Sequence, residues 1–329
     1  MATLPFSKVH ALLQRSTTIS HILQVHMQLI TNSLFFNPLF PSRLFLSLCE
    51  STGLSCSQSL YADLVFSQIP RPNTFTWNTI IRLHAISSNP SRALLLFTQM
   101  RRNGIPTDSY TYPFVLKACG SMPGSKEGVT IHGETLKLGA DVDLFVRNAL
   151  ISLYCRCGEI LEARALFDEM HMRDAFSWAV LIDGYGKKLG DFGEPEEALR
   201  LFQRMLLEGM KPDKVSAVGV IKACGRLGAL DQGHWVHSFL KKNKIMCDVV
   251  VQTALVDMYM KCGSLELARR LFESITERSV ASWNVMIVGL GNTGHGTEVV
   301  ELFYLMKREG VLMDDLTFLV YLQLVLMQA

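Results

Sequence analysis

The chain lacks a long uninterrupted apolar run. Its longest apolar-rich stretch, from Leu316 to Met327, contains Thr317 and Gln323 and is shorter than the roughly 18 apolar residues that indicate a membrane span. Charge of one sign is also scarce, because 32 Lys and Arg face 30 Asp and Glu and leave a formal net charge of +2. We therefore expect no membrane partner, and any binding to nucleic acid must come from placed side chains rather than from a basic field.

Acidic residues are missing from the beginning of the chain. Residues 1–49 contain no Asp or Glu, while Lys8, Arg15 and Arg43 and several Ser and Thr are present. This composition is typical of an organelle-targeting segment, which predicts a mitochondrial or chloroplast location. The alternative is that an acid-poor helical start belongs to the first structural repeat.

No CxxC pair occurs, which excludes the second half of the zinc deaminase signature. His132 and Glu134 supply only its HxE half, and Cys155 and Cys157 have the wrong spacing. We therefore predict that His132 and its counterpart His237 are helix-packing residues, and we expect no metal, cofactor or catalytic residue.

The eight cysteines do not suggest disulfides. Cys119 and Cys224 share one position of an internal repeat, as do Cys157 and Cys262, and such positions lie too far apart in stacked repeats to bond. We interpret them as small core residues in a reducing compartment.

A long internal repeat is the dominant feature of the sequence. KACG ends at Gly120 and again at Gly225, a shift of 105 residues (225 − 120). NALISLYCRCGEILEARALF reappears with the same shift as TALVDMYMKCGSLELARRLF. Two of the Trp-led segments are four residues closer together, since the Gly- and Pro-containing stretch 187–196 enlarges one turn.

The repeat divides further into units that each carry two apolar stretches at helical spacing. Seven predicted units tile the chain: 74–108, 109–143, 144–174, 175–213, 214–248, 249–279 and 280–314. A short-type unit is expected at 38–73, a targeting segment with a degenerate repeat at 1–37, and an incomplete repeat at 315–329. One hairpin cannot bury its apolar face alone, so stacking predicts an all-α, right-handed superhelical solenoid of helix-turn-helix repeats.

The residues resemble a known family. TFTWNTII followed by ALLLFTQMRRNGIPTD resembles a pentatricopeptide repeat, and the succession of 35, 35 and 31 residues is similar to the plant PLS subclass. The resemblance covers about residues 38–314 and implies a groove in which each repeat binds one RNA base with two or three side chains.

The resemblance assigns base recognition to the fifth and last residues of each unit, with the second residue sandwiching the base. The fifth and last residues are Asn78 with Asp108, Asn148 with Asp174, Ala179 with Asp213, Thr253 with Ser279, and Asn284 with Asp314. The second residues are Phe75, Phe145, Phe176, Val250 and Ala281. The two long units have Pro113 and Val218 at the fifth place, so we expect spacers or protein contacts there.

In the family, Asn with Asp favours uridine, so units containing Asn78, Asn148 and Asn284 are expected to prefer U. Thr253 implies a purine, and Ala179 departs from the pattern and implies poor recognition. The alternative for each polar residue alone is that it caps a helix.

Two other patterns suggest chemistry that the repeat does not support. Gly289, Gly291 and Gly294 form GxGxxG, but the same place in other units is a turn between helices, which disfavours a dinucleotide site. Trp77, Trp178 and Trp283 occupy the fourth place of their units, where helix packing is favoured over base stacking.

The last residues, LVYLQLVLMQA, lack a second helix or a polar cap, which predicts a frayed, C-terminally truncated end. The leading hypothesis is a non-enzymatic protein that binds single-stranded organellar RNA for editing or processing, with an enzyme acting in trans and no small-molecule substrate. A protein-binding helical scaffold and a truncated product without a function of its own are the alternatives.

Overall fold

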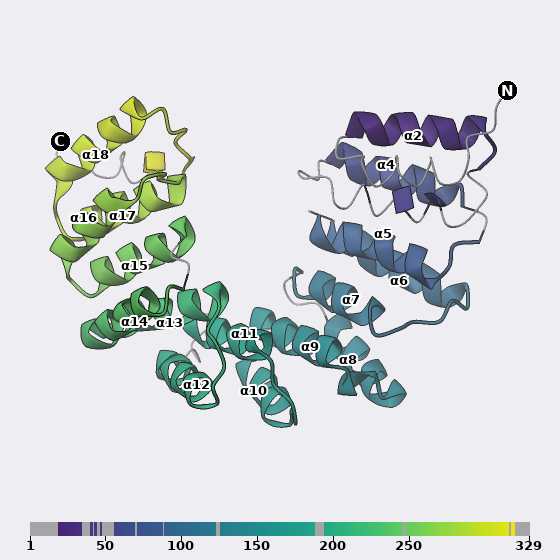
Figure 1. The fold of residues 1–329 in the computed structure, drawn as a ribbon, viewed down its shortest axis with the longest axis horizontal. Helices are drawn as coiled ribbons and strands as arrows, with labels where there is room; N and C mark the ends of the chain where they lie inside the picture. Colours follow the sequence, from purple (N-terminus) through teal and green to yellow (C-terminus); the bar gives the residue numbers. More distant parts are fainter. Residues whose placement is uncertain are drawn as a thin grey trace. The chain divides into compact units, whose positions relative to one another are not determined.

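The structure is a computed structural model in which residues 19–34, 40–41, 43–44, 47, 56–69, 71–87, 89–122, 126–187, 194–245, 248–315 and 317–319 are described. Throughout these ranges the regular elements are helices and no strand occurs, which confirms the all-α prediction (Figure 1). Residues 1–18 and 35–37 of the predicted targeting segment and degenerate repeat, most of the enlarged turn and most of the incomplete last repeat lie outside the described residues.

The chain divides into two compact units, residues 1–157 and 158–329. The first contains α2 (Ile19–Thr31), α4 (Cys56–Ser67), α5 (Thr74–Ile86), α6 (Pro90–Arg102), α7 (Thr111–Cys119), α8 (Glu127–Leu138), the 3₁₀ turn η1 (Ala140–Val142) and α9 (Leu144–Cys157). Helix α5 contacts both α6, its hairpin partner, and α7, the first helix of the next hairpin, and α7 contacts α9.

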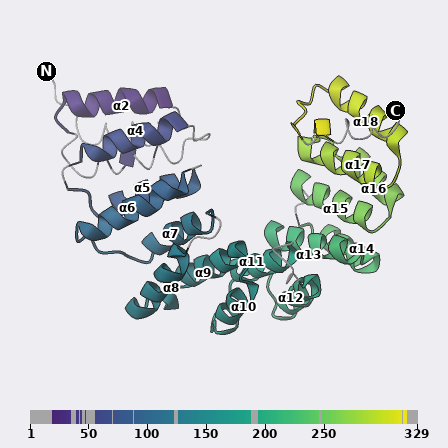
Figure 2. The same ribbon diagram turned by 180° about the vertical axis from the view of Figure 1, so that it is seen from behind.

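The second unit repeats this arrangement. It contains α10 (Ile160–Asp168), α11 (Ala175–Gly186), α12 (Pro195–Leu207), α13 (Lys214–Leu227), α14 (Leu230–Lys242), α15 (Val249–Lys261), α16 (Leu265–Ser274), α17 (Val280–Asn292) and α18 (Gly296–Arg308). The first helices α11, α13, α15 and α17 contact one another in succession, and their partners flank them, as both views of the ribbon show (Figures 1 and 2). Each unit is thus a stack of helical hairpins.

Local sequence signals set the ends of these helices. Asp174, Asp213 and Ser279 each accept a hydrogen bond from the backbone N–H three residues later, where a serine completes a capping box. Pro195 stands in the first turn of α12, where no intrahelical N–H bond is needed. Gly228 ends α13 with φ of +63°, a conformation that other residues adopt with strain.

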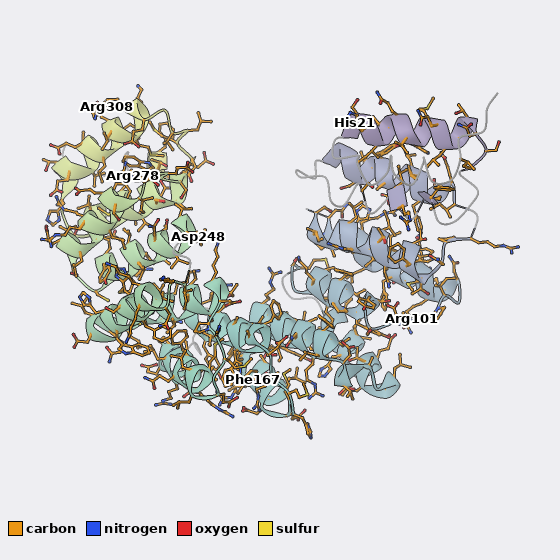
Figure 3. The ribbon with its side chains drawn as sticks, in the orientation of Figure 1. His21, Arg101, Phe167, Asp248, Arg278 and Arg308 are labelled. Atoms are coloured by element: carbon orange, nitrogen blue, oxygen red, sulfur yellow. The ribbon has the colours of Figure 1, made fainter. Side chains whose placement is uncertain are left out.

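A recurring aromatic contact joins three of the second helices to the first helix that follows. The ring centroid distances and interplanar angles are 4.7 Å and 74° for Phe66 and Trp77, 4.8 Å and 75° for Phe167 and Trp178, and 5.0 Å and 81° for Phe272 and Trp283. All three tryptophans are buried, which confirms the prediction of helix packing. Arg278, which lies in the turn before α17, covers both rings of its pair, and Figure 3 labels it together with Phe167.

Histidine and tyrosine form a second recurring contact. Nδ1 of His132 lies 2.8 Å from the hydroxyl of Tyr154, and Nδ1 of His237 lies 2.8 Å from that of Tyr259. Each pair joins a second helix to the first helix of the next hairpin, so the prediction of packing histidines is confirmed. Within the described part of the chain, no group of three or more His, Cys, Asp or Glu is placed to hold a metal ion.

Two of the three glycines of the GxGxxG pattern lie in a helix and not in the turn that was expected. Gly289 and Gly291 lie inside α17, and only Gly294, with φ of +80°, belongs to the turn that follows. A Cβ atom at Gly289 would lie less than 3.0 Å from the terminal methyl of Met260 of α15, so the Met260 side chain would have to move. A helix rather than a strand precedes the turn, so the dinucleotide-binding context is absent from this segment. Of the helices described, none is long and apolar enough to cross a membrane.

Candidate nucleic-acid interface

The second residue of each first helix is exposed to solvent. The four large apolar residues predicted for this place, Phe75, Phe145, Phe176 and Val250, have exposed fractions between 46% and 66%, and Ala281 is also exposed. Successive residues of a helix point in different directions, which explains how a buried tryptophan can lie only two positions further on. The arrangement gives each unit an apolar side chain that a flat ring could cover.

Two further residues share this place and were missed by the sequence analysis. Tyr110 and Val215 are the second residues of the long units, and they are 67% and 42% exposed. The signal that could have revealed them is the repeat itself, because the position is apolar in every unit from 74 onward. The long units therefore have the same exposed apolar second residue as the other units. Their fifth residues, Pro113 and Val218, have no side-chain group that forms hydrogen bonds.

The fifth residue lies on a different side of the helix. It is buried in the units of Asn78, Asn148, Ala179 and Asn284 and partly exposed at Thr253. Asn78, Asn148 and Asn284 are each less than 8% exposed, and Ala179 is fully buried. A buried amide is costly unless its donor and acceptor groups find partners. Each buried asparagine therefore requires hydrogen-bond partners for its amide nitrogen and oxygen.

Asn78 is held by the last residue of its own unit and by the next unit. Its Nδ2 donates to Oδ1 of Asp108 at 2.8 Å, and its Oδ1 accepts from the hydroxyl of Thr111 at 2.8 Å. Oδ1 of Asp108 also accepts the backbone N–H of Thr111 at 2.9 Å, so this aspartate caps α7 as well. Thr111 is the third residue of the following unit and was not among the site residues predicted from the sequence.

The same arrangement recurs at the other end of the chain. Asn284 Nδ2 lies 2.9 Å from both carboxylate oxygens of Asp314, and the hydroxyl of Thr317 donates to Asn284 Oδ1 at 2.7 Å. The backbone N–H of Thr317, and then the Thr317 hydroxyl and the Asn284 amide, lower the pKa of Asp314 below its ordinary value. The carboxylate is therefore charged at neutral pH and is restricted to accepting hydrogen bonds.

The unit 249–279 forms this network from hydroxyl groups. Thr253 Oγ1 lies 2.9 Å from Ser282 Oγ, which in turn lies 2.9 Å from Ser279 Oγ. In the unit 175–213 the network is incomplete, because Ala179 has no polar atom and Asp213 binds only Ser216. The hydroxyl of Thr253 can donate or accept, and Ala179 can do neither. These two units therefore present a less defined set of donors and acceptors than the units with Asn and Asp.

Asn148 lies in the first compact unit and Asp174 lies in the second. Asn148 is buried in α9. Asp174 caps α11, since its Oδ1 accepts the backbone N–H of Ser177 at 2.8 Å and the Ser177 hydroxyl at 2.6 Å. Both capping and a position beside a fifth residue are thus properties of the last residues, and the two interpretations of them are compatible.

A cavity of about 850 Å³ opens between α15 and α17 at one of these sites. Its lining includes Asn284 and Asp314 as well as Ala281, the second residue of the same unit. Lys261 also lines the cavity and pairs with Asp257 at 2.6 Å. A positively charged side chain therefore lines the cavity together with the amide of Asn284 and the carboxylate of Asp314. In this unit the three sequence-predicted residues therefore share one accessible space.

The sequence of the chain is similar to known families and proteins. The PPR repeat family matches residues 72–121, and the PPR repeat matches residues 145–174, 176–210, 253–280 and 281–311. A chloroplastic pentatricopeptide repeat-containing protein of Arabidopsis thaliana is 34% identical over 331 residues, which are 92% of this chain and 72% of the relative. A mitochondrial relative from the same plant is 37% identical over 284 residues, 85% of this chain and 40% of its own length.

Another Arabidopsis thaliana pentatricopeptide repeat-containing protein is 35% identical over 93% of this chain and 50% of its own length. The chain thus spans about half the length of several relatives. Relatives are named mitochondrial, chloroplastic or both, in agreement with the predicted location.

Among solved structures, the pentatricopeptide repeat protein PPR10 in complex with an 18-nt psaJ RNA element superposes with a TM-score of 0.75 at 14% identity, over 98% of this chain and 48% of that one. PPR10 from maize gives a TM-score of 0.59 at 20% identity, over 96% of this chain and 45% of that one. These structures share the helical-repeat fold, and the sequence matches establish the kinship. The chain belongs to the pentatricopeptide repeat family.

Proposed function

We propose that this chain binds single-stranded RNA and selects its sequence one base per unit. The observation that carries the proposal is the combination, in one unit, of an exposed second residue with a buried Asn that an Asp holds at the edge of a cavity, as at Ala281, Asn284 and Asp314. Apolar and aromatic side chains stack on the faces of unpaired bases, and amide and carboxylate groups hydrogen-bond to their edges. Solved PPR10 complexes with RNA support the proposal for this fold.

The base preferences are those that the family resemblance implies, and the chemistry of the Asn and Asp pairs is consistent with uridine. Uracil carries two carbonyl acceptors beside the N3–H donor, which an amide N–H and a carboxylate complement. We infer uridine at the units of Asn78, Asn148 and Asn284, a purine at Thr253, and no strong preference at Ala179 or at the long units. With one nucleotide per unit, the uridines occupy the first, third and seventh nucleotides and the purine the sixth.

The wider role of the chain is recognition in organellar RNA editing or processing. The alternation of 35- and 31-residue units supports membership of the PLS subclass. The candidate interface supplies hydrogen-bonding and stacking groups, which suit recognition, and we propose that the reaction itself is carried out by an enzyme acting in trans. The names of the relatives support a mitochondrial or chloroplast transcript as the target.

Selection from a randomised pool of single-stranded RNA tests the proposal. The purified chain is expected to enrich sequences with uridines at relative positions one, three and seven, and a double-stranded pool of the same composition serves as the control. Enrichment of no sequence, or equal binding of both pools, would contradict the proposal. Binding of proteins without any RNA would instead favour the scaffold function.

A further inference from the structure

We infer that the third residue of a unit sets the base selectivity of the unit before it, through Thr111 for Asn78 and Thr317 for Asn284. The inference rests on the proposed RNA binding and assigns a positioning residue that lies outside the fifth and last places. Both threonines are almost fully buried, and both donate from the hydroxyl to Oδ1 of the asparagine, at 2.8 and 2.7 Å.

The chemistry of the two partners fixes which way the amide of Asn78 faces. The Asp108 carboxylate can only accept, so it faces the Nδ2 donor, and the Thr111 hydroxyl has a proton to give, so it faces Oδ1. Rotation of the amide by 180° would place Oδ1 against the carboxylate and repel it. Both partners therefore favour one orientation, and each one alone constrains it less.

The hydroxyl of Thr111 has one other hydrogen-bond acceptor within reach among the contacts described. It accepts the backbone N–H of Asp108 at 3.1 Å, and Oδ1 of Asp108, at 2.9 Å, is its alternative acceptor. That oxygen already receives the backbone N–H of Thr111 and the Nδ2 of Asn78. The buried Oδ1 of Asn78 depends on the hydroxyl, because a buried acceptor without a donor is costly.

The fixed orientation determines what a base meets. One N–H of Asn78 is used by Asp108, and the second N–H remains beside the charged carboxylate. This donor and acceptor match uracil, in which N3 carries a proton next to a carbonyl. In cytosine N3 is an acceptor, so a carboxylate that faces it is repelled. The threonine thus favours uridine over cytidine without touching the base.

The unit 175–213 offers a matched control. Ser216 makes the same capping contacts with Asp213 that Thr111 makes with Asp108, at 2.8 Å from both its backbone nitrogen and its hydroxyl. The fifth residue there is Ala179, which has no amide to orient. A change at Ser216 therefore alters capping without altering base selection.

The test uses the full chain and the RNA selected by the wild type, with U or C at the nucleotide bound by unit 74–108. Thr111→Val keeps the side-chain shape and removes the hydroxyl. The preference for U over C at that nucleotide is expected to fall about fivefold, the effect of one hydrogen bond, with preferences at other nucleotides unchanged. Thr111→Ser is expected to restore it, and Ser216→Ala is expected to change no base preference.

Thr317→Val provides the second variant, with its effect expected at the nucleotide bound by unit 280–314, so the test survives a folding defect at either site. A wild type that prefers no base at all would overturn both the proposed function and this inference. A wild type that prefers U, with valine variants that fold and keep the full preference, would overturn the inference alone. Equal loss of affinity for every RNA would also overturn it, because a purely structural role predicts that result.

Discussion

Phe176 and Trp178 lie two residues apart in α11 and face opposite environments. Trp178 is fully buried against Phe167 of α10, whereas Phe176 is 52% exposed. One helix thus contributes an aromatic residue to the core and another to the candidate interface. Trp178 is therefore expected to contribute mainly to stability and Phe176 mainly to RNA binding, although both lie in the same turn of α11.

Substitution of each aromatic residue tests this separation. Trp178→Ala is expected to lower the free energy of unfolding by roughly 3–5 kcal/mol, because it leaves a large cavity between α10 and α11. Phe176→Ala is expected to change it by less than about 0.5 kcal/mol and to weaken RNA binding by roughly 1–3 kcal/mol, the range for a stacked base. Urea unfolding and fluorescence anisotropy measure the two effects, and a reversed pattern would refute the separation.

Ala179 offers a gain of function. Asp213 and Ser216 already make with each other the contacts that Asp108 and Thr111 make in the unit of Asn78. Ala179→Asn is therefore expected to create a new uridine preference at the fourth nucleotide of the site, where the wild type has none. Selection from the random pool measures it. A variant that folds and still accepts all four bases there would show that the polar pair is insufficient.

Stability is expected to fall as the solution is acidified from about pH 7.5 to 5.5. Burial, and then the nearby charges of Lys241 and His234, lower the pKa of His237 below 6.5. The folded state therefore binds fewer protons than the unfolded state, and this stabilisation is present above the unfolded pKa and lost as the pH falls toward the folded one. Melting temperature against pH measures the slope.

His237→Gln supplies the control for that slope, because glutamine does not titrate and can still accept a hydrogen bond from Tyr259. Its melting temperature is expected to depend less on pH, while the lowered pKa values of His26 and His84 maintain part of the slope. An unchanged slope would exclude His237 as a contributor.

Base recognition by the last complete unit is expected to tolerate mild acid. Hydrogen bonds from Thr317 and Asn284 lower the pKa of Asp314 below its ordinary value, so the carboxylate is expected to stay charged from pH 7 to about 5. Carboxyl carbon chemical shifts of Asp314 measure this. Titration above pH 4 would contradict the hydrogen-bond network.

The fold could be predicted from the sequence because the same signals recur in every unit. Trp-led first helices recur at intervals of 101 (178 − 77) and 105 (283 − 178) residues with polar turns between the helices, and the all-α hairpin prediction is confirmed. The recurring glycines were harder to interpret. Gly289 was expected in a turn but lies in α17, where it faces the side chain of Met260, which is 29 residues away in sequence.

The candidate site could be predicted only in part. The exposed second residues and the buried asparagines follow from helical periodicity once the register is known. Thr111 escaped detection because it acts on Asn78 across 33 residues and belongs to the next unit. A single sequence gives its position in the repeat but not its partner, since capping alone also explains a Ser or Thr at that place.

The most direct test of RNA recognition is the affinity of the wild type and Asn284→Ala for four RNAs that differ only at the seventh nucleotide of the selected site. The wild type is expected to bind the uridine RNA most tightly, and the variant is expected to bind all four alike while it still requires uridine at the first and third nucleotides. If the wild type binds all four equally, or if Asn284→Ala lowers every affinity by the same factor, the asparagine does not select the base.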